Sequence, residues 1–235
     1  MNRLRTAKAL KRTAAPITII PKRPVPPEAL TAMTSEWDVD AESAFVPAFD
    51  VANWMREAFI DPGGPLANEE HEHLTQAEIG VLWTNVRNVR QMRITLGTAE
   101  IPEPKGNAWQ RERQRLQIRQ WFAPIGREPD FIITLSAPYC AGASDAAFCA
   151  LIEHELYHCA QATNPRTGEP SFARETGLPL WTIRGHDLEE FIGVARRYGT
   201  AVPAIAEFVK AVRLGPTIAL ADLSGACGTC LQKVA

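Results

Sequence analysis

The stretch "LIEHELYHCA", from Leu151 to Ala160, places His154 and His158 four residues apart, with Glu155 beside the first histidine. Each residue of an α-helix turns by about 100°, so the two imidazoles project from one face, one turn apart. This spacing suits chelation of one divalent cation, while Glu155 points slightly aside, where its carboxylate can act as a base. We therefore interpret the stretch as a metal-site helix, with two histidine ligands and Glu155 as the catalytic residue.

The residues around this motif predict a helix from about residue 145 to 161, with Ser144 as its N-cap. Its apolar residues fall on a face that excludes both histidines: Phe148, Cys149, Ile152, Leu156 and Cys159. A structural histidine would be expected among these packing residues, so the separation favours a metal site. Two metal-free structural histidines are the alternative interpretation.

A hydrolytic zinc site normally takes three protein ligands and leaves one position for water. The segment "RGHDLEEFIGVARRYG" predicts a second helix over 186–198, in which His186 and Glu190 share one polar face. We favour His186 as the third metal ligand, with Glu190 as the alternative. The one that does not bind metal, or Asp187, would orient a ligand. An exposed acidic helix face without metal is the remaining interpretation.

The rest of the chain predicts a mixture of helices and short strands. We expect a helix within Ala41–Ile60, a break at Asp61–Pro65, and a helix over Leu74–Val86 with Thr75 as N-cap. Strands are expected at Met92–Leu96, in the second half of 107–122 and within Pro129–Pro138, and a last apolar stretch at Val202–Val212. These elements predict an α+β fold in which a short sheet packs on the metal-site helix and further helices.

The length of 235 residues and the 46% apolar content fit one compact domain. We expect a basic, proline-rich flexible arm at 1–33, the domain at 34–213, and a C-terminal tail at 214–235. We interpret the arm as a solvated tail, and a weak contact with nucleic acid or another partner through its positive charge is the alternative. No stretch is apolar enough to span a membrane.

The five cysteines form an odd set without a signal peptide before them, which indicates a reducing, cytoplasmic compartment. Cys227 and Cys230 form one CxxC pair, and we interpret them as reduced thiols in the tail because a structural zinc site needs more ligands. His71 and His73 are expected in a solvated loop, with a second metal site as the alternative.

Four segments together resemble the phage metallopeptidase family: "HLTQAEIGVLWTNV", "PDFIITLSAPY", "CALIEHELYHCAQ" and "IRGHDLEEFIGVARRYG". The resemblance covers residues 74 to 199, and leaves out the N-terminal arm and the C-terminal tail. It implies a small zincin-like domain in which His154 and His158 bind the metal and Glu155 is the base. It also marks the segment 186–190, without indicating which residue is the ligand. A family of this kind implies the cytoplasm of a bacterial host or of a cell carrying a prophage.

The sequence therefore predicts a zinc-dependent metallopeptidase that cleaves a protein or peptide substrate. One alternative is a regulatory or binding protein that keeps the zinc fold without turnover. Another is a protease that the basic arm targets to proteins bound to nucleic acid. Tyr157 and Tyr198 lie near the motifs, but we expect Tyr157 to point away from the site and Tyr198 to face the core.

Overall fold

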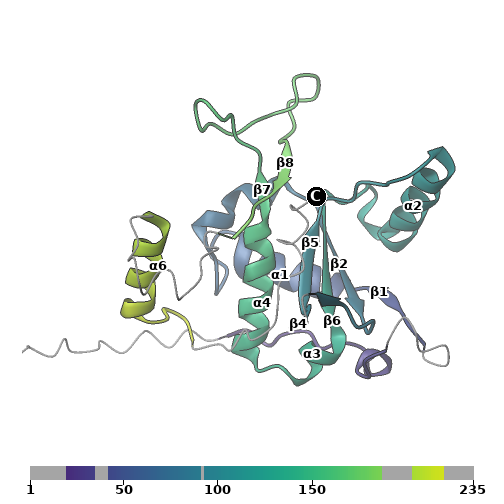
Figure 1. Cartoon of the computed structure of the whole chain (residues 1–235), viewed down its shortest axis with the longest axis horizontal. Helices are drawn as coiled ribbons and strands as arrows, with labels where there is room; N and C mark the ends of the chain where they lie inside the picture. Colours follow the sequence, from purple (N-terminus) through teal and green to yellow (C-terminus); the bar gives the residue numbers. More distant parts are fainter. Residues whose placement is uncertain (1–19, 35–41, 91–92, 187–202, 220–235) are drawn as a thin grey trace, which may run out of the picture.

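The structure is a computed structural model that describes residues 20–34, 42–90, 93–186 and 203–219. It has a mixed α+β fold built on a four-stranded sheet in the order β1-β2-β6-β5, which confirms the predicted class (Figure 1). The strands are β1 (Phe45–Pro47), β2 (Ile79–Thr84), β5 (Gly97–Glu100) and β6 (Phe131–Ser136). The central strands β2 and β6 are parallel, and the two outer strands run antiparallel to their neighbours.

The central strand β2 occupies the segment in which the sequence predicts a helix over Leu74–Val86, so that prediction is wrong. All six residues of β2 are buried, because both faces of the sheet are covered at this point. A strand buried on both faces is a continuous apolar run without alternation, and such a run does not distinguish strand from helix. The preceding 3₁₀ helix η3 (Glu69–Gln76) begins at Asn68, whose side chain caps it, and not at Thr75.

The predicted helix within Ala41–Ile60 is correct only in its second half. Strand β1 comes first, and it is followed by α1 (Phe49–Met55) and one π-helical turn, η2 (Arg56–Ile60). Pro47 fits the edge strand β1, because proline has no N–H to donate to a sheet. The predicted break follows at Asp61, where Gly63 adopts a φ of 85°.

Residues 108–121 form the helix α2 (Ala108–Trp121), so the strand expected in the second half of 107–122 is wrong. The helix begins with a capping box in which Asn107 and Gln110 each accept a hydrogen bond from the other's backbone N–H. This cap satisfies two N–H groups that a helix start otherwise leaves unpaired. None of its residues is buried.

The strand predicted at Met92–Leu96 is correct only in part, because only Arg93 and Ile94 form a strand there. Strand β4 (Arg93–Ile94) pairs with β3 (Val89–Arg90) in a small hairpin, while β5 begins three residues later in the main sheet. Met92 lies outside the described residues. The last apolar stretch forms the helix α6 (Pro203–Leu214).

The strand predicted within Pro129–Pro138 is confirmed as β6, and it leads through α3 (Ala137–Gly142) into α4 (Asp145–His158). Ser144 is the N-cap of α4, as predicted, and its Oγ accepts a hydrogen bond from the backbone N–H of Ala147 at 3.2 Å. The helix ends at His158 because the next residues form β7 (Cys159–Gln161).

The hydrophobic core lies between α4, α1 and one face of the sheet. Helix α4 runs alongside β5 (Figure 1), and its predicted apolar face is buried. The largest core side chains come from all three layers: Met55, Phe59, Trp83, Phe131, Ile133, Leu135, Phe148, Ile152 and Leu156. A smaller cluster of Leu82, Phe122 and Ile132 forms separately. Packing thus fixes α4, and the histidines that it carries, against the sheet.

The described part of the expected N-terminal arm packs on the domain. Leu30 is buried, and Arg23 reaches the junction of α3 and α4. The guanidinium of Arg23 donates to Asp145 Oδ1 at 2.9 Å and to the backbone oxygens of Cys140 and Ala143 at 3.0 and 2.6 Å. Residues 20–34 therefore belong to the folded structure, while residues 1–19 lie outside the described part of the chain.

Candidate metal centre

Helix α4 presents His154 and His158 side by side at its C-terminal end. Their Nε2 atoms lie 3.3 Å apart, and their ring centroids 5.0 Å apart. His158 is 2% exposed, so its imidazole is buried more deeply than a separate polar strip on α4 would predict. The pair lies at the end of α4, which continues directly into strand β7.

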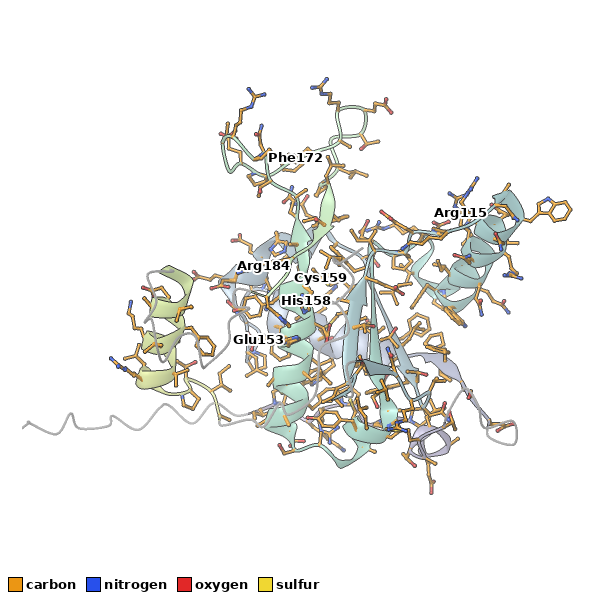
Figure 2. The ribbon with its side chains drawn as sticks, viewed as in Figure 1. Arg115, Glu153, His158, Cys159, Phe172 and Arg184 are labelled. Atoms are coloured by element: carbon orange, nitrogen blue, oxygen red, sulfur yellow. The ribbon has the colours of Figure 1, made fainter. Side chains whose placement is uncertain are left out.

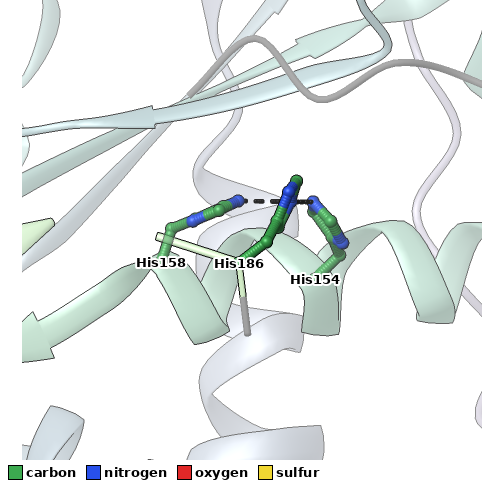
Figure 3. A group of neighbouring side chains, drawn as sticks. All are labelled: His154, His158 and His186. Carbon is green, nitrogen blue, oxygen red and sulfur yellow. Dashed lines mark hydrogen bonds between the residues drawn. The ribbon is translucent and has the colours of Figure 1, made fainter. Parts of the chain in front are cut away.

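A β-hairpin brings His186 to this pair. Strand β7 pairs antiparallel with β8 (Trp181–Ile183), with Cys159 opposite Ile183. The backbone N–H of Arg184 donates to the His158 oxygen at 2.9 Å, which carries the pairing one residue further. His186 follows two residues later, and its Nε2 lies 3.2 Å from that of His154 (Figure 3). The third histidine is thus delivered by the return strand of a hairpin.

The three histidines have a geometry that fits one tetrahedral metal ion. Each offers one ring nitrogen, and these nitrogens all lie within 4.8 Å of one another. Four-coordinate zinc with Zn–N bonds of about 2.0–2.1 Å separates neighbouring ligand nitrogens by about 3.3–3.4 Å. The two measured separations, 3.3 and 3.2 Å, are close to this value. The donor set therefore fits zinc, and it leaves a fourth position for water or substrate.

The backbone of Arg184 fixes how His158 can bind a metal. The Nδ1 atom of His158 lies 2.6 Å from the carbonyl oxygen of Arg184, which can only accept a hydrogen bond. Nδ1 must therefore carry the proton, and Nε2 has a lone pair for the metal. A second hydrogen bond of this kind orients most metal-binding histidines and strengthens their basicity. Figure 2 shows Arg184 beside the C-terminal end of α4.

Glu155 is completely buried between α4 and the edge strand β5. Its carboxylate lies against the Cα of Gly97, since a Cβ at that position would stand 2.6 Å from Glu155 Oε1. Any residue larger than glycine at position 97 would press on the carboxylate. The absence of a side chain at position 97 thus leaves room for the carboxylate of Glu155.

A cavity of about 600 Å³ opens beside the three histidines. Its other walls come from Tyr157 and Arg184 near the end of α4, from Glu70, and from Glu207, Phe208 and Ala211 of α6. Tyr157 therefore faces the cavity, and the expectation that it points away is wrong. The guanidinium of Arg184 lies 5.9 Å from the centroid of the Tyr157 ring. The space is large enough to admit a peptide side chain next to the metal position.

A partly buried polar network supports the Tyr157 wall of this cavity. The Nδ2 atom of Asn68 donates to both Glu153 Oε1 and the Tyr157 hydroxyl, each at 2.9 Å. His71 is 1% exposed and its ring lies edge-on against Tyr157, with centroids 4.7 Å apart. Burial, with a smaller effect of His73, lowers the pKa of His71 to about 4. Burial also raises the pKa of Glu153 and that of Tyr157.

The expectation of a solvated loop around His71 and His73 is therefore wrong. His71 packs inside the network, and His73 Nε2 lies 2.9 Å from the backbone oxygen of Cys159. The 3₁₀ helix η3 thus lies against the C-terminal end of α4. Its acidic sequence, "EEHEHLTQ", gives no sign of burial. The packing depends on two buried residues, His71 and Leu74, rather than on a periodic apolar face.

Three cysteines among the described residues are free and buried: Cys140, Cys149 and Cys159. Burial raises the pKa of Cys140 to about 12, that of Cys149 to about 11, and that of Cys159 well above its usual value. These thiols are packed side chains, as expected for Cys149 and Cys159. Cys227 and Cys230 lie outside the described residues, as do Asp187, Glu190 and Tyr198.

The sequence model of one family, described as "Putative phage metallopeptidase", matches residues 52–213. The chain belongs to this family. The match extends beyond the region of resemblance on both sides. It includes the C-terminal half of α1, the sheet strands β2, β5 and β6, the three histidines and most of α6. No curated protein and no solved structure matches the chain. Family membership and the histidine cluster together support a metallopeptidase in general.

Two residues that matter for this site were not singled out from the sequence. Gly97 follows a strand-like stretch, and nothing in the sequence links it to Glu155 fifty-eight positions later. Arg184 acts through its backbone oxygen, so its side chain carries no signal of that contact.

Among the described helices, none is long and apolar enough to cross a bilayer.

Proposed function

We propose that this member of the phage metallopeptidase family is a zinc-dependent peptidase that hydrolyses a peptide bond in a protein or peptide substrate. The observation that supports it most is the meeting of His154, His158 and His186 at distances typical of a tetrahedral zinc site. Family membership gives independent support. A zincin-like arrangement is part of the proposal, with α4 as the helix that carries the metal ligands.

In this proposal the three imidazoles hold the zinc ion, which supplies Lewis acidity towards a carbonyl group and makes water a nucleophile near neutral pH. His158 is held in the required tautomer by Arg184, so its Nε2 is available as a ligand. The cavity beside the histidines receives the substrate, and the aromatic rings of Tyr157 and Phe208 contact its side chain.

Glu155 is the proposed general base. Its carboxylate accepts a proton from the attacking water and passes that proton to the leaving amine. Its burial beside Gly97 supports the role, because a carboxylate enclosed by backbone keeps a fixed position relative to α4.

Substitution of Glu155→Gln tests the proposed hydrolysis. Zinc content should stay near that of the wild type, because the imidazoles remain, while cleavage of a casein or peptide-library substrate should fall by at least about a hundredfold. A variant that keeps both its zinc and full cleavage would exclude Glu155 as the base. Equal biological activity of both proteins, without any cleavage, would favour the regulatory or binding alternative.

The third ligand is tested by His186→Ala and Glu190→Ala in parallel. We expect zinc loss in the first variant and retained zinc in the second, measured by mass spectrometry of the dialysed proteins. The opposite pattern would make Glu190 the ligand.

The cytoplasmic location also belongs to the proposal, and it rests on the free thiols of the described cysteines.

A further inference from the structure

The helix α2 has no role in the metal centre, and it stands apart from the rest of the domain. Figure 1 shows it projecting on the far side of the sheet from α4. It is anchored near its C-terminal end, where Ile118 and Trp121 pack against the cluster around Phe122. Trp121 also stacks on Phe45, with ring centroids 6.2 Å apart. The N-terminal turns have no such apolar anchor, so this part of α2 is accessible from several sides.

The charge of α2 is opposite to that of the whole chain. It carries Arg111, Arg113, Arg115 and Arg119 against Glu112 alone, while the chain as a whole has a net charge of −2. Arg119 pairs with Glu128 at 2.7 Å, and Arg115 with Glu112 at 3.6 Å, in contacts that water can reach. Arg113 has no ion-pair partner within the described ranges. The helix therefore carries an excess of positive charge, and none of its residues is fully buried.

The outward face of α2 also exposes apolar area among hydrogen-bonding side chains. Trp109 is 89% exposed and Leu116 is 56% exposed. On a helix with about 100° per residue, Arg113, Gln117 and Gln120 lie on the same face as these two residues. Two separated apolar residues do not form the continuous apolar stripe that a membrane-surface helix needs. Arginine and glutamine, in contrast, are the side chains that bind phosphates and base edges.

We propose that α2 binds duplex DNA by placing its N-terminal turns in the major groove. An α-helix with side chains is about 10–12 Å wide, which matches a major groove of about 12 Å. The accessible end of α2 is also its N-terminal end, which carries the positive end of the helix dipole and favours nearby phosphates. This inference goes beyond peptide hydrolysis, and it would hold the enzyme next to proteins that are bound to DNA.

The double substitution Arg111→Gln/Arg113→Gln, in the N-terminal turns of α2, tests this surface. Glutamine keeps a high helix propensity, so circular dichroism should be unchanged. Binding of a fluorescent 20-base-pair duplex, measured by anisotropy at about 50 mM salt, should weaken about tenfold for each lost phosphate contact. The slope of log affinity against log salt should also fall by about two. The matched control is Arg166→Gln/Arg174→Gln, which removes the same charge from exposed residues of the 162–180 loop.

The outcomes separate α2 from other sources of binding. The full-length chain is used throughout, so the basic residues 1–19 are the same in every variant. Loss of affinity in the α2 variant but not in the control supports the proposal. Equal effects in both, no binding by the wild type, or tighter binding to a single strand or to phosphatidylserine vesicles would overturn it.

Discussion

At position 97, the absence of a side chain leaves the space that the carboxylate of Glu155, the proposed base, occupies. The carboxylate of Glu155 occupies the space that a Cβ on residue 97 would need, with a separation of 2.6 Å to Oε1. A contact this short forces the carboxylate to move, and Glu155 has no solvent-exposed space into which it can swing. The position of the proposed base therefore depends on a residue of the edge strand.

We expect Gly97→Ala to lower the peptidase kcat by about ten- to a hundredfold, because a displacement of about 1 Å in a catalytic group costs that much. Zinc content should not change, since the three imidazoles are untouched. Gly142→Ala is the matched control, because a Cβ there meets nothing within 4 Å. Equal activity of both variants would show that Glu155 tolerates the displacement or is not the base.

His71 should make stability depend on pH in the acidic range. Its folded pKa of about 4 lies below its usual value of 6.5, so the unfolded chain binds the proton more tightly. The contribution of His71 to the free energy of unfolding is fully present above about pH 6.5. The free energy of unfolding falls by about 3 kcal/mol as the pH drops towards 4.

Urea unfolding of metal-free protein at pH 7 and pH 4.5 measures this effect. His71→Leu should remove the part of the pH dependence that His71 causes, with His154, His158 and His186 contributing equally to both proteins. An identical loss of stability in the variant would mean that folding does not lower the pKa of His71.

At the scale of single elements, Arg23 holds the start of the metal-site helix. Its side chain is 9% exposed, it donates to two backbone oxygens at the end of α3, and its guanidinium lies 4.9 Å above the Phe148 ring. Asp145 is largely exposed, so the ion pair itself adds little. The charged hydrogen bonds to the two carbonyls carry most of the contribution.

Arg23→Ala should destabilise the protein by about 2–3 kcal/mol, because the carbonyls of Cys140 and Ala143 lose their charged donor. Thermal and urea unfolding measure the change. The neighbouring exposed residue gives the control, Lys22→Ala, for which we expect about 0.5 kcal/mol or less. A similar small effect for both would show that residues 20–26 do not stabilise α4.

Elements with a local signal could be predicted from the sequence, and elements defined by distant partners could not. Strand β6 lies between prolines, and α4 has both its Ser144 cap and its apolar face. Strand β2, in contrast, looks like a helix, since its strand character comes from pairing with β6. In α2 the alternation of polar and apolar residues suggested a strand, but a capping box of two residues determined the outcome.

The same distinction between local and distant signals applies to the residues of the candidate site. The spacing of His154 and His158 follows from the geometry of one helix, so the sequence predicts their meeting. The meeting with His186 was proposed from a second helix, whereas in the structure a β7–β8 hairpin brings it there. The contact of Gly97 with Glu155, and that of Arg184 with His158, depend on tertiary packing that no local pattern reveals.

For the whole molecule, a metal ion would join α4 to the segment that follows β8. Ligands from two parts of the chain make metal binding a contribution to folding stability, because the unfolded chain has no preformed site. At a zinc concentration about a thousand times the dissociation constant, the stabilisation is about 4 kcal/mol.

Removal of zinc with a chelator should therefore lower the Tm, and added zinc should restore it. Scanning calorimetry of the wild type and His186→Ala measures the effect. The variant should show a much smaller response to zinc, since one of its ligands is missing. An equal response of both proteins would place the stabilising metal elsewhere, with Cys227 and Cys230 as the first candidates.

X-ray absorption spectroscopy at the zinc edge tests the central claim most directly, because it reports the atoms bound to the metal in the full-length protein. We predict three imidazole nitrogens and one further light atom, at about 2.0–2.1 Å. A first shell containing sulfur at about 2.3 Å, or one with fewer than three imidazoles, would contradict a metal centre built from His154, His158 and His186.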